Sequence, residues 1–511
     1  MKKLLVIYAI CIFTGCLFFN SSIPNAVAAE KAKYGGVLKF NSSKGAGIFG
    51  DPLKTFAFNH GFCEVALQCL LLPSKKNMGG FEPELATSWK LASDKSNYLF
   101  TLQKGVRFHD GTEFNAQAVK WNLDRWIQSE RPRLDKVKSI DILDDHTIRL
   151  NLSGWDAVVL SDFIKDTFII SPTAYEKNGA KWAEYNPVGT GAFKLAEHKR
   201  NVILKFEKFE DYWQKGLPYL DGFHITMIPD PMTAIAALKR GEVDALVPVD
   251  GITADQLKKE NKYTIIAHPA IHNLLEFNSK NPTSPWSDKR MRMALEYAID
   301  KKAITDAVGR GYLYPVYEIV HSIPSGAGTT PRKFNPEKAR QLIKEAGYTG
   351  LKVKIQYMTM PSSQDSVVAI QRYLADVGIE VVPVPLTPAV FMQKLYEPIV
   401  GNNLLLSDQR GGPAELVIAV DETLAPGSVF YQATKRPEGF NELIDIALRQ
   451  DSMDQILKYF FKLEKLAYDE CMFVPLWGNL FPAVQYPYVK DAFWFYGGIP
   501  YAKLRWAWID K

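Results

Sequence analysis

Three segments of the chain repeat apolar residues with the period of an α-helix. Over residues 288–308, apolar residues recur three or four positions apart, which predicts an amphipathic helix with one buried face. Residues 454–469 repeat the same pattern. The third segment begins at Asn335-Pro336 and ends at Gly347, and these residues favour the cap, the first turn and the end of a helix. We therefore expect three long helices in these places.

Short apolar segments elsewhere in the chain favour β-strands. Residues 202–206, 353–357 and 379–382 are rich in valine and isoleucine, which is typical of strands. Residues 36–40 are a fourth candidate. Strands that alternate with helices predict an α/β fold. No Gly/Ser-rich linker divides the chain, so we expect any connection between domains to be a short hinge and not a flexible tether.

Length and composition limit the kind of protein. The chain has 511 residues, enough for roughly two to four domains. Apolar residues make up 47% of it and charged residues 23%, which is typical of a globular protein. The formal net charge is only +5, and the basic residues are scattered instead of forming the stripe that binds nucleic acid. We therefore expect no nucleic-acid partner.

The first residues have the pattern of an export signal. Lys2 and Lys3 precede an uncharged apolar run over residues 4–19, which is too short to span a membrane comfortably. Small residues then lead to a signal-peptidase site after Ala28. We therefore predict a signal peptide over residues 1–28 and a periplasmic protein.

Two other interpretations of this segment stay open. Residues 13–16 approximate a lipobox, so that Cys16 would become a lipid-anchored N-terminus. A buried N-terminal helix is the remaining alternative.

Three cysteines follow the export signal, at Cys63, Cys69 and Cys471. Residues 62–72 favour a helix, which would separate Cys63 from Cys69 by about 9 Å along its axis. That separation is too large for a disulfide. We expect buried free thiols, with a pair that includes Cys471 as the alternative, and the cysteine spacing predicts no structural zinc site.

Two motifs that suggest a cofactor or a metal occur in unsuitable surroundings. Residues 45–50 match G-x-G-x-x-G, but Asp51-Pro52 follow where a dinucleotide-binding fold needs a helix. We therefore expect a loop there. His268 and His272 have the spacing of two metal ligands on a helix, but Pro269 and the neighbouring apolar residues favour a strand. We expect no cofactor and no metal.

Motifs of hydrolytic enzymes are also missing from the sequence. It contains neither G-x-S-x-G nor a phosphate-binding G-x-x-x-x-G-K-[ST]. The carboxylate pairs Glu82/Glu84 and Asp144/Asp145 are interpreted as solvated loop charges. A pair of carboxylates brought together only by the fold stays possible, so an exported hydrolase acting on peptides or glycans is the alternative function.

A series of motifs along the chain resembles the family 5 extracellular solute-binding proteins, the peptide/nickel-type receptors of ABC importers. The motifs occur in the family's order behind the export signal. They are Phe81-Glu82-Pro83-Glu84-Leu85-Ala86-Thr87-Ser88-Trp89, Gly105-Val106-Arg107-Phe108-His109-Asp110-Gly111, Pro187-Val188-Gly189-Thr190-Gly191-Ala192-Phe193, Asp211-Tyr212-Trp213, Gly241-Glu242-Val243-Asp244, Phe277-Asn278 and Ala298-Ile299-Asp300. Most of these residues have scaffold roles: Asp110 and Gly111 form a turn, and Gly189 and Gly191 allow close backbone approach.

The resemblance implies a periplasmic-binding-protein clamshell with two lobes and an extra inserted domain. Lobe one would comprise residues 34–70, 187–272 and 484–511, and the inserted domain residues 71–186. Lobe two would comprise residues 273–483. The ligand would be enclosed between the lobes as they close, and a membrane permease would receive it. We expect a monomer.

The resemblance also indicates where a ligand would bind. Peptide-binding members hold the ligand's ammonium with an aspartate in lobe two, and the matching position here falls on Gln409 or Arg410, or on Asp408 if the alignment shifts. Arg410 would suit a carboxylate, so we expect an acidic, carboxylate-bearing ligand, with a peptide-like one as the alternative. Backbone N–H groups at Gly411 and Gly412 would add hydrogen bonds.

Three further residues are candidates for ligand contact. Lys165 would supply a second positive charge from the inserted domain. Phe49 and Asp51 follow the first predicted strand and would line the cleft. An exposed loop position is the alternative for Arg410.

Overall fold

The computed structural model describes residues 32–511 except 44, 56–58, 75–79, 130–133, 165–166, 319–328, 360, 411–415, 427, 429, 497–498 and 502–503. The predicted signal peptide, Cys16, Lys165 and Gly411 therefore lie outside the described residues. In the part that is described, no helix has the length and apolar character needed to cross a membrane.

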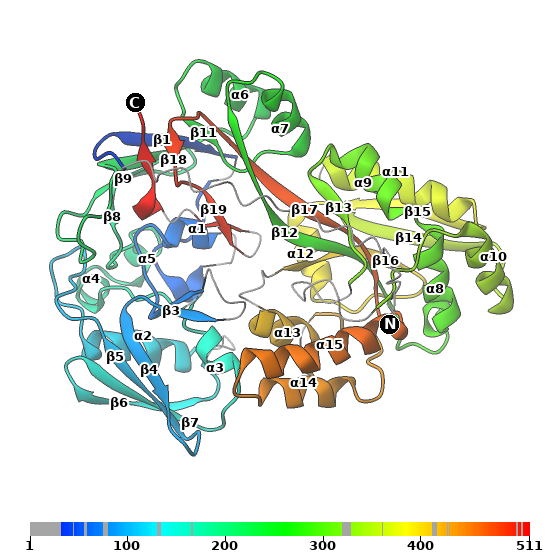
Figure 1. Cartoon of the computed structure of the whole chain (residues 1–511), viewed down its shortest axis with the longest axis horizontal. Coiled ribbons are helices and arrows are strands. Elements are labelled where there is room, and N and C mark those ends of the chain that lie inside the picture. The colour runs from blue at the N-terminus through cyan, green and yellow to red at the C-terminus, as the bar shows by residue number, and fades with distance from the viewer. Residues whose placement is uncertain are drawn as a thin grey trace, which may run out of the picture.

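One sheet runs through most of the molecule (Figure 1). Its strands are β1 (Val37–Ser42), β8 (Phe193–Lys199), β9 (Ile203–Lys208), β10 (Gly222–Met227), β11 (Ala245–Leu246), β12 (Thr264–Phe277), β13 (Leu313–Pro315), β14 (Leu351–Met358), β15 (Ile379–Leu386), β16 (Leu404–Arg410) and β17 (Val474–Gln485). Their order is β15-β14-β16-β12-β17-β11-β1-β10-β9-β8, and β13 pairs with β17. The two long strands β12 and β17 lie in the middle of this order, so they join its two ends.

The end of the sheet that contains β1 and β8–β11 forms what we call the first body. Aromatic and aliphatic side chains of these strands make its core, in which Phe206 and Phe223 stack at 4.8 Å between ring centroids. Helices α6 (Pro231–Lys239) and α7 (Gly251–Lys258) pack beside β11 in a smaller apolar cluster. The parallel pairing of β1 with β10 and β11 fits the predicted α/β class.

The other end of the sheet, with β14–β16, forms the second body. Leu404 and Leu406 on β16 belong to one apolar cluster and Leu405 to another, as alternation along a strand requires. Helices therefore cover both faces. They are α8 (Lys289–Ala298), α9 (Lys301–Gly309), α10 (Pro336–Glu345) and α11 (Pro361–Ala375) on one face, and α12 (Pro388–Leu395), α13 (Leu416–Leu424), α14 (Phe440–Leu448) and α15 (Met453–Asp469) on the other.

A separate sheet of four strands, which we call the four-stranded unit, packs against the first body (Figure 1). Its strand order is β4-β5-β7-β6, and helices α2 and α3 share its apolar core. The bounds are β4 (Ala86–Leu91), β5 (Asn97–Leu102), β6 (Val137–Asp144), β7 (Thr147–Leu152), α2 (Ala116–Ile127) and α3 (Val158–Ser161).

Short elements complete the described fold. The helices are α1 (His60–Cys63), α4 (Pro172–Asn178) and α5 (Ala180–Ala183), with 3-10 turns η1 (Pro52–Lys54), η3 (Pro285–Ser287) and η5 (Leu504–Trp506). The strands are β2 (Leu71–Pro73), β3 (Phe81–Pro83), β18 (Val489–Lys490), β19 (Trp494–Tyr496), β20 (Ile499–Tyr501) and β21 (Trp508–Ile509).

The three predicted long helices are confirmed, and one of them is divided. Asn335 caps α10 by accepting a hydrogen bond from the Lys338 N–H, and α15 covers the predicted 454–469 segment. The 288–308 segment forms α8 and α9, because Ile299 adopts an extended conformation and Asp300 caps the second helix. The four predicted strands correspond to β1, β9, β14 and β15.

The helix predicted over residues 62–72 is wrong. Helix α1 ends at Cys63, and Leu71 already belongs to β2. Most of the segment is buried, and its backbone bonds to distant segments, as where the Leu71 N–H donates to the Phe163 carbonyl oxygen at 3.1 Å. The Ala66 carbonyl oxygen instead accepts a hydrogen bond from the Gly191 N–H at 3.0 Å.

The motif over residues 105–111 contacts the motif over residues 187–193, and the second motif also packs closely on Ala66. A Cβ on Gly189 would lie 2.3 Å from the Ala66 carbonyl oxygen, which confirms the predicted close approach. The turn at Asp110-Gly111 is also confirmed, since Gly111 has φ +82. One ring nitrogen of His109 lies 2.9 Å from the Gly191 carbonyl oxygen. Burial of this ring lowers the pKa of His109 to about 4, so the ring is neutral at pH 7.

The three cysteines in the described part of the chain are buried free thiols, as predicted. Burial raises the pKa of Cys471 to about 12, which keeps that thiol protonated and unreactive at neutral pH.

Candidate functional site

The two bodies meet at the antiparallel pair of β12 and β17. Their register shifts twice, between Pro269 and Ile271 and between Asn273 and Leu274. Such bulges weaken a ladder locally and increase its twist. The predicted lobe boundaries, at residues 272 and 484, fall inside these two strands, and they stay predictions because the strands are continuous. This stretch of paired strand is where the two ends of the sheet are joined.

A tyrosine from β13 covers this stretch. The Tyr314 hydroxyl lies 3.1 Å from Nε2 of His272. Its ring packs directly on Gly478 of β17, where an added Cβ would lie 2.2 Å from Cζ of Tyr314. Only a glycine admits the ring so closely. His268 and His272 both lie on β12, as the strand prediction required.

Strand β16 brings the predicted ligand residues next to this stretch. In the register of β12 and β16, Asp408 pairs with Asn273 and Arg410 pairs with Ile271. Gln409 lies between them, opposite His272. The Asp408 carbonyl oxygen accepts a hydrogen bond from the Tyr431 hydroxyl at 3.3 Å. For Gln409 and Arg410 the structure describes the backbone alone, so their role as ligand contacts stays a prediction.

A buried glutamate lies on the same pair of strands and was not predicted. Glu276 on β12 is buried, and burial raises its pKa to about 8 while the Ser407 hydroxyl lowers it. The carboxyl group is therefore protonated at pH 7. The only signal in the sequence is a single acidic residue within the apolar run from Leu274 to Phe277.

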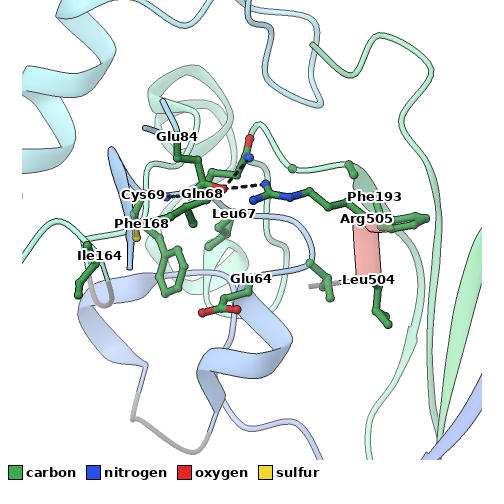
Figure 2. Close-up of a pocket in the computed structure, with 14 residues that line it drawn as sticks. Glu64, Leu67, Gln68, Cys69, Glu84, Ile164, Phe168, Phe193, Leu504 and Arg505 are labelled. Carbon is green, nitrogen blue, oxygen red and sulfur yellow. Dashed lines mark hydrogen bonds and ion pairs between the residues drawn. The ribbon is translucent and has the colours of Figure 1, made fainter. Parts of the chain in front are cut away.

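A cavity opens in the first body, close to the four-stranded unit (Figure 2). Its empty volume is about 460 Å³, including the solvent at its mouth. Its wall includes charged side chains at Glu64, Glu84 and Arg505, and apolar ones at Ile164 and Phe168. Ile164 directly precedes the predicted ligand residue Lys165 in the sequence.

Arg505 and Glu84 form a buried ion pair at the back of this cavity. The Arg505 Nη1 lies 2.7 Å from Oε1 of Glu84, and both side chains are buried. The amide of Gln68 donates to the same Oε1 at 3.0 Å (Figure 2). Burial lowers the pKa of Arg505, but Glu84 and the Tyr212 hydroxyl together more than offset this, so the pKa is raised overall. The prediction that Glu84 carries a solvated loop charge is therefore wrong, because its carboxylate is buried against Arg505. No signal in the sequence indicates this pair, since the two residues are 421 positions apart.

Phe49 and Asp51 lie in the interior of the first body. Phe49 is fully buried, with its ring centroid 5.4 Å from that of His198. Both carboxylate oxygens of Asp51 lie 3.0 Å from Nη2 of Arg125 on α2, and the Arg125 guanidinium stacks on Tyr175. These contacts hold the four-stranded unit to the first body. As ligand contacts both residues stay predictions.

The loop over residues 45–50 is irregular, as predicted, and Asp51 caps only the short turn η1. Within the described ranges, no group of three His, Cys, Asp or Glu side chains could hold a metal ion.

The architecture is that of two-lobed solute-binding proteins. The structure of the substrate-binding protein CtaP from Listeria monocytogenes superposes with a TM-score of 0.81 at 19% identity, covering 94% of this chain and all of CtaP. NikA from Brucella suis, solved with Fe(III)-EDTA, gives a TM-score of 0.80 at 22% identity over 91% of this chain and 99% of NikA. These similarities show the fold.

Sequence comparison identifies the family. Residues 80–411 match the bacterial extracellular solute-binding proteins, family 5 (middle), and since the match covers more than half of the chain, the chain belongs to this family. A glutathione-binding protein, GsiB of Pectobacterium atrosepticum, is 35% identical over 307 residues, which are 58% of this chain. The match spans 59% of GsiB's length.

Proposed function

We propose that this chain is the solute-binding receptor of an ABC importer. It captures a small solute between two lobes and delivers it unaltered to a membrane permease. The match to family 5 over residues 80–411 carries this proposal, and the fold supports it, because two bodies joined by β12 and β17 can close like a clamshell. In this interpretation the first body and the four-stranded unit are one lobe, and the second body is the other.

The guest that we propose is a carboxylate-bearing small molecule. Arg410 at the end of β16 lies beside the strands that join the bodies, and a guanidinium binds a carboxylate with two parallel hydrogen bonds. GsiB is named for glutathione, which bears two carboxylates, and NikA was solved with a polycarboxylate complex. Backbone N–H groups of Gly411 and Gly412, and the charge of Lys165, would add to the site.

The compartment that we propose is the periplasm, since the family is extracellular and the first 28 residues have the pattern of a signal peptide. Anchoring at Cys16 is the alternative. The receptor would act as a monomer that binds its permease only transiently.

Native mass spectrometry of the purified protein, followed by calorimetric titration with glutathione, tests the receptor function. We expect one guest per chain, recovered chemically intact. Recovery of a cleaved guest would contradict the proposal and support the hydrolase alternative, which the family assignment disfavours.

The Arg410→Ala variant tests the carboxylate contact. A fully enclosed charge pair would lose about 2–5 kcal/mol of binding free energy on truncation, so titration should show affinity weakened at least thirtyfold. Arg340→Ala is the matched control, since Arg340 is an exposed arginine of α10 that pairs with Glu337 of the same helix. Equal affinities of the two variants would place Arg410 outside the site.

A further inference from the structure

The four-stranded unit touches the second body at a place where no chain segment connects them. Residues 153–158 follow β7 and lead into α3. At their end, the Ala157 N–H donates to the Leu448 carbonyl oxygen of α14 at 2.7 Å. That carbonyl is at the C-terminus of its helix, where no intrahelical donor is available to it. The hydrogen bond therefore satisfies the Ala157 N–H of the four-stranded unit and the Leu448 carbonyl oxygen of the second body.

Apolar packing accompanies this hydrogen bond. The Val158 side chain is buried in the same cluster as Leu416, Val417 and Val420 of α13. Its chain neighbour Val159 belongs to the core of the four-stranded unit instead. The short helix α3 thus has one side in each part of the molecule, as Figure 1 shows near α13 and α14.

An ion pair lies at the edge of the same contact. Lys95, in the turn between β4 and β5, pairs with Asp451, which follows α14. The Lys95 ammonium also lies 4.0 Å from the centroid of the Trp155 ring. Trp155 is held in turn by its indole N–H, which donates to the Tyr98 hydroxyl at 2.9 Å. The lysine is therefore positioned by its own unit to meet the aspartate of the other.

The contact is weaker than the attachment of the four-stranded unit to the first body. That attachment contains the buried pair Glu84–Arg505 and the pair Asp51–Arg125, in which the carboxylate is buried and 19% of the Arg125 side chain is exposed. In the Lys95–Asp451 pair, by contrast, 37% and 72% of the side chains are exposed. Exposed pairs contribute little, so the four-stranded unit stays with the first body when the bodies part, and this contact is the one that opens.

We propose that this contact is a latch that holds the two lobes together without a guest. The inference rests on the proposed function, because a clamshell must open and close. The latch consists of the Ala157–Leu448 hydrogen bond, the Val158 side chain and the Lys95–Asp451 pair. It joins α3 and the turn between β4 and β5 to helices α13 and α14 of the second body. The latch stabilises the closed form before a guest binds. A stronger latch therefore lowers the part of the guest's binding free energy that is needed to close the lobes.

Distance measurements in guest-free protein test the latch. Spin labels would be placed at Leu143→Cys on β6 and Ile446→Cys on α14, two exposed positions on opposite sides of the contact. In the predicted mature chain from Ala29, the native cysteines are Cys63, Cys69 and Cys471, which are buried, so the introduced thiols would take the label. Pulsed electron resonance then gives the ratio of short to long distances, and we expect the short distance to dominate.

Two kinds of variant separate the components. Lys95→Asp should lower the closed-to-open ratio about two- to fivefold, and combining it with Asp451→Lys should restore the ratio. Ala157→Pro removes the N–H donor while its φ of −69 suits proline, and it should lower the ratio about two- to tenfold. Lys352→Asp is the control, because Lys352 forms an exposed pair with Glu380 within the second body.

The latch would be contradicted by unchanged distances in both Lys95→Asp and Ala157→Pro. It would also be contradicted if adding Asp451→Lys to Lys95→Asp failed to restore the closed-to-open ratio. Thermal unfolding shows whether each variant is folded. Because no guest is present, the outcome does not depend on whether the chain binds a solute, so failure of the latch and failure of the receptor function are distinguishable.

Discussion

At the scale of single residues, the fold depends on polar side chains of two kinds, those that bond to their own backbone and those that are buried with a distant partner. Asp110 and Gly111 form the predicted turn, because an Asp-Gly pair acts through its own backbone. Glu84 could not be assigned its partner, since Arg505 reaches it only through the fold. Glu276 was missed for the same reason: its neutral state depends on burial between strands that are far apart in the chain.

The Glu84–Arg505 pair gives a prediction at this scale. Arg505→Met would leave the Glu84 carboxylate buried without its counter-charge, which should lower the free energy of unfolding by about 3–5 kcal/mol. Combining it with Glu84→Gln should recover most of this loss, because no uncompensated charge then stays buried. Denaturant unfolding curves measure both, and equal stability of the single variant and the wild type would contradict the burial described.

At the scale of elements, periodicity predicted long helices and strands well and short buried segments poorly. Helix α15 follows its apolar stripe, whereas the segment 62–72 leaves the helix after Cys63 because its backbone groups bond to distant segments such as Phe163 and Gly191. The site depends on such non-local contacts. The family resemblance placed Arg410 in lobe two, but only the pairing of β16 with β12 puts that residue beside the connection between the bodies.

Gly478 gives a prediction for the connection itself. In Gly478→Ala the new Cβ would overlap the Tyr314 ring, and the strain should cost about 1–3 kcal/mol of stability. Adding Tyr314→Ala should relieve that strain. Thermal unfolding of the single and double variants measures the effect. A single variant as stable as the wild type would show that β13 can move away from β17 at no cost.

At the scale of the whole molecule, the resemblance predicted more than any pattern of residues. The two-lobed fold was predicted from a series of motifs in the order typical of the family, although no single motif is specific for it. The division into lobes at residues 272 and 484 is still a prediction, because one sheet passes through both places. The contact of the four-stranded unit with α13 and α14 had no sequence signal, since it joins surfaces from opposite ends of the chain.

The latch should also respond to pH through Asp421 of α13. Burial raises the pKa of Asp421 to about 6; Lys136 lowers it, and Asp156, Glu422 and Asp135 raise it. Lys136, Asp156 and Asp135 belong to the four-stranded unit, so parting the contact should return the pKa towards its ordinary value near 3.8. The closed form then binds the proton more tightly, and lowering the pH from 7.5 to 5 should favour closing by about 1 kcal/mol.

The same spin-label distances at the two pH values measure this effect. Asp421→Asn should show the low-pH ratio at both values, because it carries no charge to bury. A wild-type ratio that falls on acidification would have the wrong sign and would contradict this assignment.

The hydrogen-bonded pair of β12 and β17 also determines which movements are available. A pleated sheet resists sliding of its strands, because that breaks every hydrogen bond of the ladder at once, but it bends readily across its width. Since both crossings of the chain lie side by side in one sheet, they must flex in concert. In the proposed receptor, any movement of one half relative to the other would therefore pass through both strands, and a guest that closes the halves would move the outer surface of each half as one unit.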